Sequence, residues 1–246
     1  VAENKPLVDY NHEGIATLSA GDEVGHGGGG HSWDNGGTGG ATYDISSNVG
    51  APIIVLPRPN LGTSQKSASI SPENHLVVPT VTVQNDYTIY MVLYGGGSSD
   101  QRISTVYGSA DTQTLGPTLG SDAFFNADGS VAKFKGQANG FQDIIALVIR
   151  RDSSNNMYMY NGDGDVVGFI DAKTASSTLS TVKTSDATDG RTDGDLVIER
   201  LGTVGSLNSV AYGAQMQLAR FGVITKDIGS AACSKLATDL FNFYKV

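Results

Sequence analysis

The chain has 246 residues and carries 25 Asp and Glu against 16 Lys and Arg, a net charge of −9. Nucleic-acid binders gather Lys and Arg on one surface, and no such cluster occurs here, so we expect no nucleic-acid partner. No apolar run approaches the length that crosses a bilayer, which argues against membrane insertion, and a single cysteine excludes an internal disulfide. The 32 Gly and the charged fraction of only 17% predict an all-β domain, which we take as one unit over residues 1–246.

The first part of the chain, residues 1–76, is predicted to be an irregular, Gly-rich portion packed on the sandwich. Prolines around residues 51–59 limit any strand there to an edge or a short ladder. From residue 77 the pattern becomes regular. Residues 87–94 form an apolar and aromatic run between polar and glycine-rich turns, which is typical of a buried strand. Alternation places Tyr90 and Tyr94 on one face of that strand.

The region from 143 to 170 predicts a meander of three antiparallel strands, near 144–149, 157–160 and 166–170. Tyr158 and Tyr160 share one face of the middle strand. A polar stretch, 173–194, reads as a long surface loop. Two further strands are expected, at 195–201 and 214–224.

The period then changes to that of a helix. Cys233, Leu236, Leu240 and Phe243 recur at three- and four-residue spacing, which predicts one C-terminal amphipathic helix with these four residues against the sandwich. We interpret Cys233 as a small buried apolar residue and not as a nucleophile.

Three segments carry a resemblance to a known family. They are the strand "Tyr87-Thr88-Ile89-Tyr90", the hairpin over 145–162, and the strand over 216–224 followed by a helix that ends at Tyr244. Together they resemble the concanavalin A-like lectin/glucanase superfamily in its laminin-G-like branch. The resemblance covers roughly residues 77–246 and implies a jelly-roll sandwich of two antiparallel sheets. Such domains serve as sugar-binding, adhesion and spacer modules, including on phage tails and capsid surfaces.

The glucanase members of this superfamily use carboxylates spaced as Glu-x-Asp-x-x-Glu, and that motif is missing from this sequence. Asp195 and Glu199 are four apart on an expected strand, too far along it to act as an acid and nucleophile pair. We therefore predict no catalytic residues and no enzymatic activity.

Residues 25–40 are the most unusual part of the chain because glycine alternates there with polar and aromatic side chains. His31, Trp33, Asp34 and Asn35 could supply an aromatic face and hydrogen-bonding groups for a sugar. The alternative, which we favour for Trp33, is that this single Trp closes the edge of the sandwich. Tyr94, Tyr158 and Tyr160 could form a second sugar-stacking surface, although tyrosines on sheets more often pack in the core.

Metal sites receive a weaker prediction. Asp186, Asp189, Asp193 and Asp195 crowd one expected loop, and laminin-G-like domains often hold calcium at the rim of the sandwich. A plain acidic loop is the interpretation we favour, and calcium is the alternative. The loop at 161–165 begins like a calcium loop but lacks its later ligands, and His26 and His31 have no third ligand for zinc.

We therefore expect a non-catalytic recognition module, directed at a carbohydrate and carried on a phage virion or another extracellular assembly. Its partners would be a cell-surface glycan or neighbouring virion proteins, and the low charge also permits a homo-oligomer. Two alternatives remain open: a structural virion protein that acts through protein contacts, and a polysaccharide hydrolase or lyase.

Overall fold

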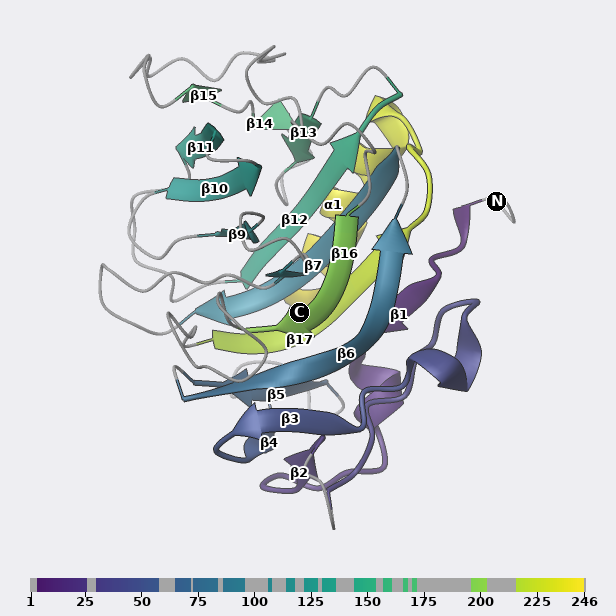
Figure 1. The fold of residues 1–246 in the computed structure, drawn as a ribbon, viewed down its shortest axis with the longest axis vertical. Coiled ribbons are helices and arrows are strands. Elements are labelled where there is room, and N and C mark those ends of the chain that lie inside the picture. Colours follow the sequence, from purple (N-terminus) through teal and green to yellow (C-terminus); the bar gives the residue numbers. More distant parts are fainter. Residues whose placement is uncertain are drawn as a thin grey trace.

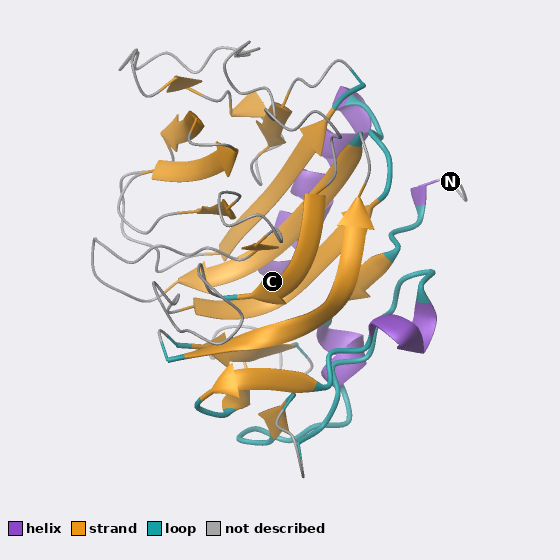
Figure 2. Ribbon diagram, viewed as in Figure 1, coloured by secondary structure: helices purple, strands orange, loops and turns teal. Residues whose placement is uncertain are grey.

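The structure is a computed structural model, and Figures 1 and 2 show that strands dominate it. It describes residues 4–25, 30–57, 65–71, 73–83, 86–95, 106–107, 114–117, 122–127, 130–135, 144–153, 157–160, 166–167, 170–171, 196–202 and 216–245. Within these ranges the fold is a β-sandwich of antiparallel sheets with one C-terminal helix, as the composition and the strand pattern predict.

The larger sheet runs through the centre of the molecule, and its strands pair antiparallel (Figure 1). In spatial order they are β14 (Val166–Val167), β13 (Met157–Tyr160), β12 (Ile144–Arg151), β7 (Tyr87–Gly95), β17 (Met216–Ile224), β5 (Lys66–Ile70), β4 (Ile53–Pro57) and β2 (Glu23–Val24). The short strand β1 (Val8–Tyr10) also pairs with β17, beyond the point where β5 stops pairing with it.

The second layer consists of a three-stranded sheet, in the order β16 (Leu196–Leu201), β6 (Asn74–Val83) and β3 (Ser47–Gly50). A further sheet has the order β15 (Ile170–Asp171), β11 (Ser130–Lys135), β10 (Asp122–Ala127), β9 (Thr114–Pro117) and β8 (Val106–Tyr107). Because β8 lies beside β16, this sheet continues the second layer.

The pairing of the predicted meander is confirmed, because β12, β13 and β14 pair in sequence as antiparallel neighbours. The third strand is shorter than the expected 166–170: β14 ends at Val167, and Ile170 belongs to β15, which pairs with β11 in another sheet. The strands expected at 195–201 and 214–224 are also present, as β16 and β17. The expected long loop at 173–194 lies outside the described residues.

Side chains of β7 alternate between two buried clusters. Ile89 and Met91 face the second layer, whereas Tyr90 and Val92 face the helix. The central sheet is therefore covered on both faces, which explains why its strands are almost continuously apolar. The register of β6 shifts near Pro79, since Ile198 pairs with Val81 but Arg200 pairs with Val77. Proline has no N–H for the ladder, and a bulge is where a strand tolerates it.

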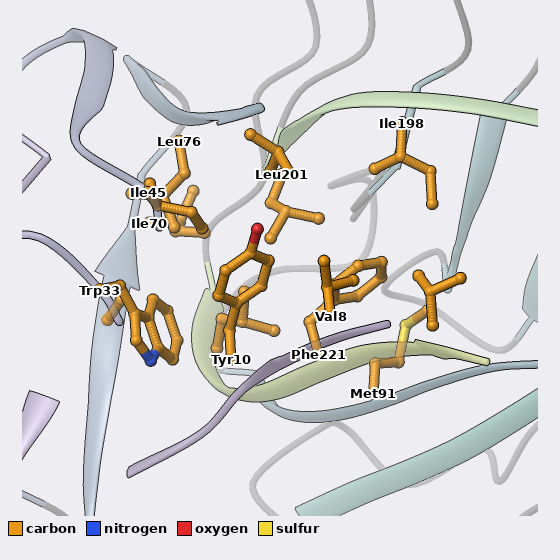
Figure 3. Close-up of a cluster of buried hydrophobic side chains, with 14 of the residues drawn as sticks. Val8, Tyr10, Trp33, Ile45, Ile70, Leu76, Met91, Ile198, Leu201 and Phe221 are labelled. Atoms are coloured by element: carbon orange, nitrogen blue, oxygen red, sulfur yellow. The ribbon is translucent and has the colours of Figure 1, made fainter. Parts of the chain in front are cut away.

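The core between the layers includes residues from the N-terminal portion (Figure 3). Tyr10 of β1 lies between Trp33 and Phe221, with ring centroids 6.0 Å and 6.4 Å away respectively. All three side chains are fully buried. The first part of the chain thus contributes large aromatic groups to the sandwich and adds short strands and two 3₁₀ helices, η2 (His12–Ile15) and η3 (Gly40–Tyr43).

The helix α1 (Ser230–Lys245) lies behind β12 and β7 in Figure 1 and packs on both strands. Cys233 and Leu240 are buried as predicted, and Leu236 packs at the edge of their cluster. Phe243 is a correction, because its side chain is 46% exposed while Ala237 and Tyr244 are fully buried. The buried stripe follows the i, i+4, i+7, i+11 positions, and Phe243 falls one residue short of it. Among the described residues, no helix is long and apolar enough to cross a membrane.

Candidate ligand-binding site

The structure separates the predicted ligand-binding residues into two groups. Tyr158 and Tyr160 lie on β13, whereas Asn35 forms a bridge with Tyr10 of β1. Four strand spacings separate β13 from β1 in the sheet, about 19 Å at 4.8 Å per spacing. The two groups therefore cannot contact the same sugar ring.

The first group is largely committed to holding the N-terminal portion together. The Trp33 indole is fully buried and its Nε1 donates to the Asn11 carbonyl over 2.7 Å, so the ring presents no open face. The Asn35 side chain accepts from the Asp9 and Gly37 amides and donates to two backbone carbonyls. Both side chains act as structural groups here.

His31 and Asp34 belong to the same segment but are exposed. The Asp34 carboxylate accepts a hydrogen bond of 2.7 Å from the Ser32 hydroxyl, while the backbone of His31 bridges to Val24. These are ordinary surface groups around a buried Trp, which is the arrangement that the alternative interpretation of residues 25–40 expects.

The second group is organised around Arg150 of β12. Arg150 pairs across the ladder with Tyr158, so both side chains stand on the helix-facing side of the sheet. The guanidinium lies 4.1 Å from the centroid of the Tyr158 ring, and its Nε donates to the Tyr160 hydroxyl over 2.9 Å. A planar cation stacked on an aromatic ring fixes the orientation of both groups.

Asp227, in the turn before α1, completes this arrangement. Its Oδ2 accepts from Arg150 Nη1 over 2.6 Å, and its Oδ1 accepts from the Gly229 amide over 2.7 Å. The Tyr160 hydroxyl in turn donates to the Ser230 Oγ over 3.0 Å. The site therefore joins two strands of the sheet to the first turn of the helix.

The Tyr158 side chain is half-buried, as are Arg150, Asp152 and Asp227, whereas Tyr160 is fully buried. Burial and the Asp152 carboxylate raise the pKa of Tyr158, although the guanidinium of Arg150 opposes this. The phenol is therefore neutral at physiological pH, and its hydroxyl lies 3.5 Å from Asp152 Oδ2. An aromatic ring beside fixed donors and acceptors is suited to binding a ligand. We call Arg150, Asp152, Tyr158, Tyr160 and Asp227 the Tyr158 site.

A second polar cluster lies on the same face of the sheet near the end of α1. The Asp9 carboxylate accepts two hydrogen bonds of 2.8 Å from Arg220 and one of 2.9 Å from the Tyr90 hydroxyl. Burial, followed by the Asp9 charge, raises the pKa of Tyr90. His12 packs near Phe243 and Tyr244, with ring centroids 5.3 Å and 6.3 Å away. This cluster ties both chain ends to the sheet.

Several predicted site residues fall in parts of the chain that the structure does not describe. The side chain of Tyr94 and all four loop aspartates, Asp186, Asp189, Asp193 and Asp195, lie outside the described residues. On β16, the Glu199 Oε2 lies 3.7 Å from the Arg200 Nη2. In the described part of the chain, no three His, Cys, Asp or Glu residues are close enough to hold a metal ion. Burial raises the pKa of the Cys233 thiol to about 12, which makes it a poor nucleophile.

Arg150, Asp152 and Asp227 are the site residues that the sequence analysis missed. One signal could have found Arg150: extending the predicted hairpin by one residue pairs it with Tyr158 on the same face. Asp227 gives no such signal, because its position follows from how α1 returns onto the sheet, 77 residues after Arg150.

Comparison with known proteins identifies the fold. No protein-family model matches the sequence, and a comparison with curated proteins gives no match. Solved structures do match. Domain 4 of AbnA, a GH43 extracellular arabinanase from Geobacillus stearothermophilus in complex with arabinotriose, has a TM-score of 0.54 at 11% identity, covering 97% of this chain and 99% of that one.

Two botulinum neurotoxin binding domains match as well. The serotype DC domain, in complex with rat synaptotagmin II, has a TM-score of 0.54 at 11% identity, and the serotype G domain has 0.51 at 11%. They cover 98% and 96% of this chain, which spans about half of each toxin chain, 52% and 51%. The chain shares their β-sandwich fold.

Proposed function

We propose that this protein is a non-catalytic carbohydrate-binding module whose ligand packs against the exposed part of Tyr158. The observation that carries the proposal is the geometry of this ring, which is half-buried and backed by a guanidinium at 4.1 Å. Sugars present C–H faces that stack on aromatic rings and hydroxyls that need donors and acceptors at the ring edge. Arg150 and Asp152 supply such groups beside Tyr158.

The structural neighbours support a binding role. The arabinanase domain was solved with arabinotriose, and another match, with a TM-score of 0.50, concerns the entry of botulinum neurotoxin type C through two ganglioside molecules. Arabinotriose and gangliosides both contain sugars, and the second match covers 51% of that toxin chain. Membership of the concanavalin A-like superfamily, a single domain over 1–246, a location on a virion or other extracellular assembly, and calcium in the 186–195 loop stay predictions.

A structural virion protein acting through protein contacts has less support. Within the described ranges the large apolar side chains that are exposed are Ile54 at 36% and Phe243 at 46%. Ile54 lies on β4 and Phe243 on α1. A contiguous exposed apolar patch of several hundred square ångströms would mark such an interface.

The test is a titration of the folded protein with a panel of oligosaccharides, including arabinotriose, followed by calorimetry. For any sugar that binds, Tyr158→Ala should weaken binding at least tenfold, which corresponds to about 1.4 kcal/mol. Tyr158→Phe keeps the ring and should retain most of the affinity. Tyr43→Ala is the matched control, because Tyr43 is also half-buried but lies on η3. Unchanged sugar affinity of the Tyr158→Ala variant would contradict the proposed site.

A further inference from the structure

The Tyr158 site is one end of a row of side chains that crosses the central sheet. Thr88 of β7 pairs with Arg150 of β12 in the ladder, and Arg150 pairs with Tyr158 of β13. Directly paired residues of antiparallel strands stand on the same face, so the three side chains lie on the face that α1 covers. Thr88 is fully buried and lies two strand spacings, about 10 Å, from Tyr158. It therefore cannot touch a ligand that packs on the Tyr158 ring.

Thr88 holds the turn between β17 and α1. Its hydroxyl donates to the Lys226 carbonyl over 3.0 Å and accepts from the Ile228 amide over 3.4 Å. Asp227 lies between these two residues, so the two hydrogen bonds fix its backbone on both sides. The Asp227 amide itself donates to the Asp86 carboxylate over 3.1 Å. The start of β7 therefore sets where the Asp227 side chain stands.

The position of Asp227 in turn determines where the Arg150 guanidinium lies. The Asp227 Oδ2 accepts from Arg150 Nη1 over 2.6 Å, while its Oδ1 stays bonded to the Gly229 amide. A short charge-assisted hydrogen bond is directional and the guanidinium is planar, so a shift of the carboxylate turns the plane that lies 4.1 Å from the Tyr158 ring. The orientation of Tyr158 thus depends on a contact chain that begins at Thr88.

We propose that Thr88 is a positioning residue of the Tyr158 site, which aligns Asp227 and Arg150 and thereby the ring on which a sugar stacks. This inference rests on the proposed carbohydrate-binding function and adds a residue that controls its affinity without contacting the ligand. Side chains that are oriented before the ligand arrives bind more tightly, because ordering them on binding costs free energy.

The experiment compares two substitutions of Thr88. Thr88→Val removes the hydroxyl and keeps the branched shape, which suits the apolar strand β7, whereas Thr88→Ser keeps the hydroxyl. Binding is measured by calorimetry with arabinotriose and with every other oligosaccharide that binds the wild-type protein. Thr88→Val should weaken binding about fivefold, the equivalent of one ordinary hydrogen bond, and Thr88→Ser should retain most of the affinity.

Val92→Ala is the matched control for lost stability. Val92 is fully buried on the same face of β7, four residues and about 13 Å along the strand from Thr88. This substitution removes packing without reaching the turn at Asp227, so sugar affinity should stay unchanged.

A double-mutant cycle tests the route through Asp227. Asp227→Asn removes the charge that holds Arg150, so Thr88→Val should cost less affinity in that background than it costs alone. Fully additive losses, or wild-type affinity in folded Thr88→Val protein, overturn the positioning role and leave the proposed carbohydrate-binding function standing.

A measurement without ligand separates the two proposals. The Nε–H resonance of Arg150 in a proton–nitrogen NMR spectrum, identified by its loss in Arg150→Lys, is shifted by the ring current of Tyr158 while the guanidinium lies over the ring. Thr88→Val should move this resonance toward its position in Tyr158→Leu, and Thr88→Ser and Val92→Ala should leave it in place. An unmoved resonance overturns the positioning role. A moved resonance in a protein that binds none of the oligosaccharides overturns the carbohydrate-binding function and retains the alignment of Tyr158 by Thr88.

Discussion

The ring of Tyr90 lies directly over Gly222, its neighbour across the β7–β17 ladder. A Cβ at position 222 would come within 2.0 Å of the ring, so this position can hold only glycine unless Tyr90 moves. Tyr90 is in turn fixed by its hydrogen bond to Asp9. A residue without a side chain thus makes room for the contact that joins β1 to the centre of the sheet.

Asp9 is the residue whose replacement we expect to cost most in this cluster. Asp9→Asn leaves the Arg220 guanidinium without its counter-charge, and the two side chains are 9% and 26% exposed. We expect a loss of about 2–3 kcal/mol, below the value for a fully buried pair because Arg220 is partly solvated. The measurement is the free energy of unfolding in urea.

Asp239→Asn is the control for this comparison. It makes the same chemical change in the Lys235 to Asp239 pair of α1, whose side chains are 75% and 57% exposed. Exposed pairs of this kind contribute about 0.3–0.5 kcal/mol. Equal losses for the two variants would contradict the structural role of the Asp9 cluster.

The helix α1 is attached to the sheet through a narrow stripe of buried side chains. Leu240 is 3% exposed and packs into the cluster between helix and sheet, whereas Phe243 is 46% exposed. Leu240→Ala should therefore cost about 2–4 kcal/mol. Phe243→Ala should cost less than about 1.5 kcal/mol, since it removes mainly ring contacts with His12 and Tyr244. Urea unfolding of both variants tests which substitution costs more free energy of unfolding. A larger loss for Phe243→Ala would support the buried position that the sequence predicted for Phe243.

Elements with local signals were predictable. The meander of β12, β13 and β14 follows from alternation and tight turns, and α1 follows from its spacing of apolar residues. Phe243 was assigned wrongly because a period of 3.6 residues leaves adjacent positions ambiguous at a helix end. The Tyr158 site was predictable as far as its tyrosines, since they alternate on one strand. Its Arg150 to Asp227 pair and the Asp9 to Arg220 pair connect distant segments, and no local pattern encodes them.

For the molecule as a whole, the contact between its first and last described segments makes stability depend on pH. Burial lowers the pKa of His12 from its ordinary value of 6.5, and the Arg220 charge lowers it further, while Glu13 and Asp9 oppose this. The unfolded chain therefore binds a proton at His12 more readily than the folded chain does. The contribution of neutral His12 to the free energy of unfolding is therefore fully present above about pH 6.5. It is lost as the pH falls below that value toward the lower pKa of His12 in the folded protein.

The lowered pKa of His12 predicts that the urea midpoint of the protein decreases as the pH falls from 7.5 to 5.5. His12→Phe keeps an aromatic ring against Phe243 and Tyr244 and cannot be protonated, so its midpoint should change less over the same interval. Parallel curves for the two proteins would show that other groups govern the acid response. His31→Phe, at an exposed position, is the control that should leave the wild-type slope in place.

Because β1 pairs with β17, β1 cannot join the central sheet until most of the chain has been synthesised. Asp9 and Arg220 are 211 positions apart in the chain, and β1 has β17 as its ladder partner. At a translation rate of 5–20 residues per second, the first strand emerges roughly 10–40 s before its partner exists. During that interval Val8 has no ladder partner and Tyr10 lacks Phe221 on one side, so nascent chains should be vulnerable to chaperone capture and to proteolysis.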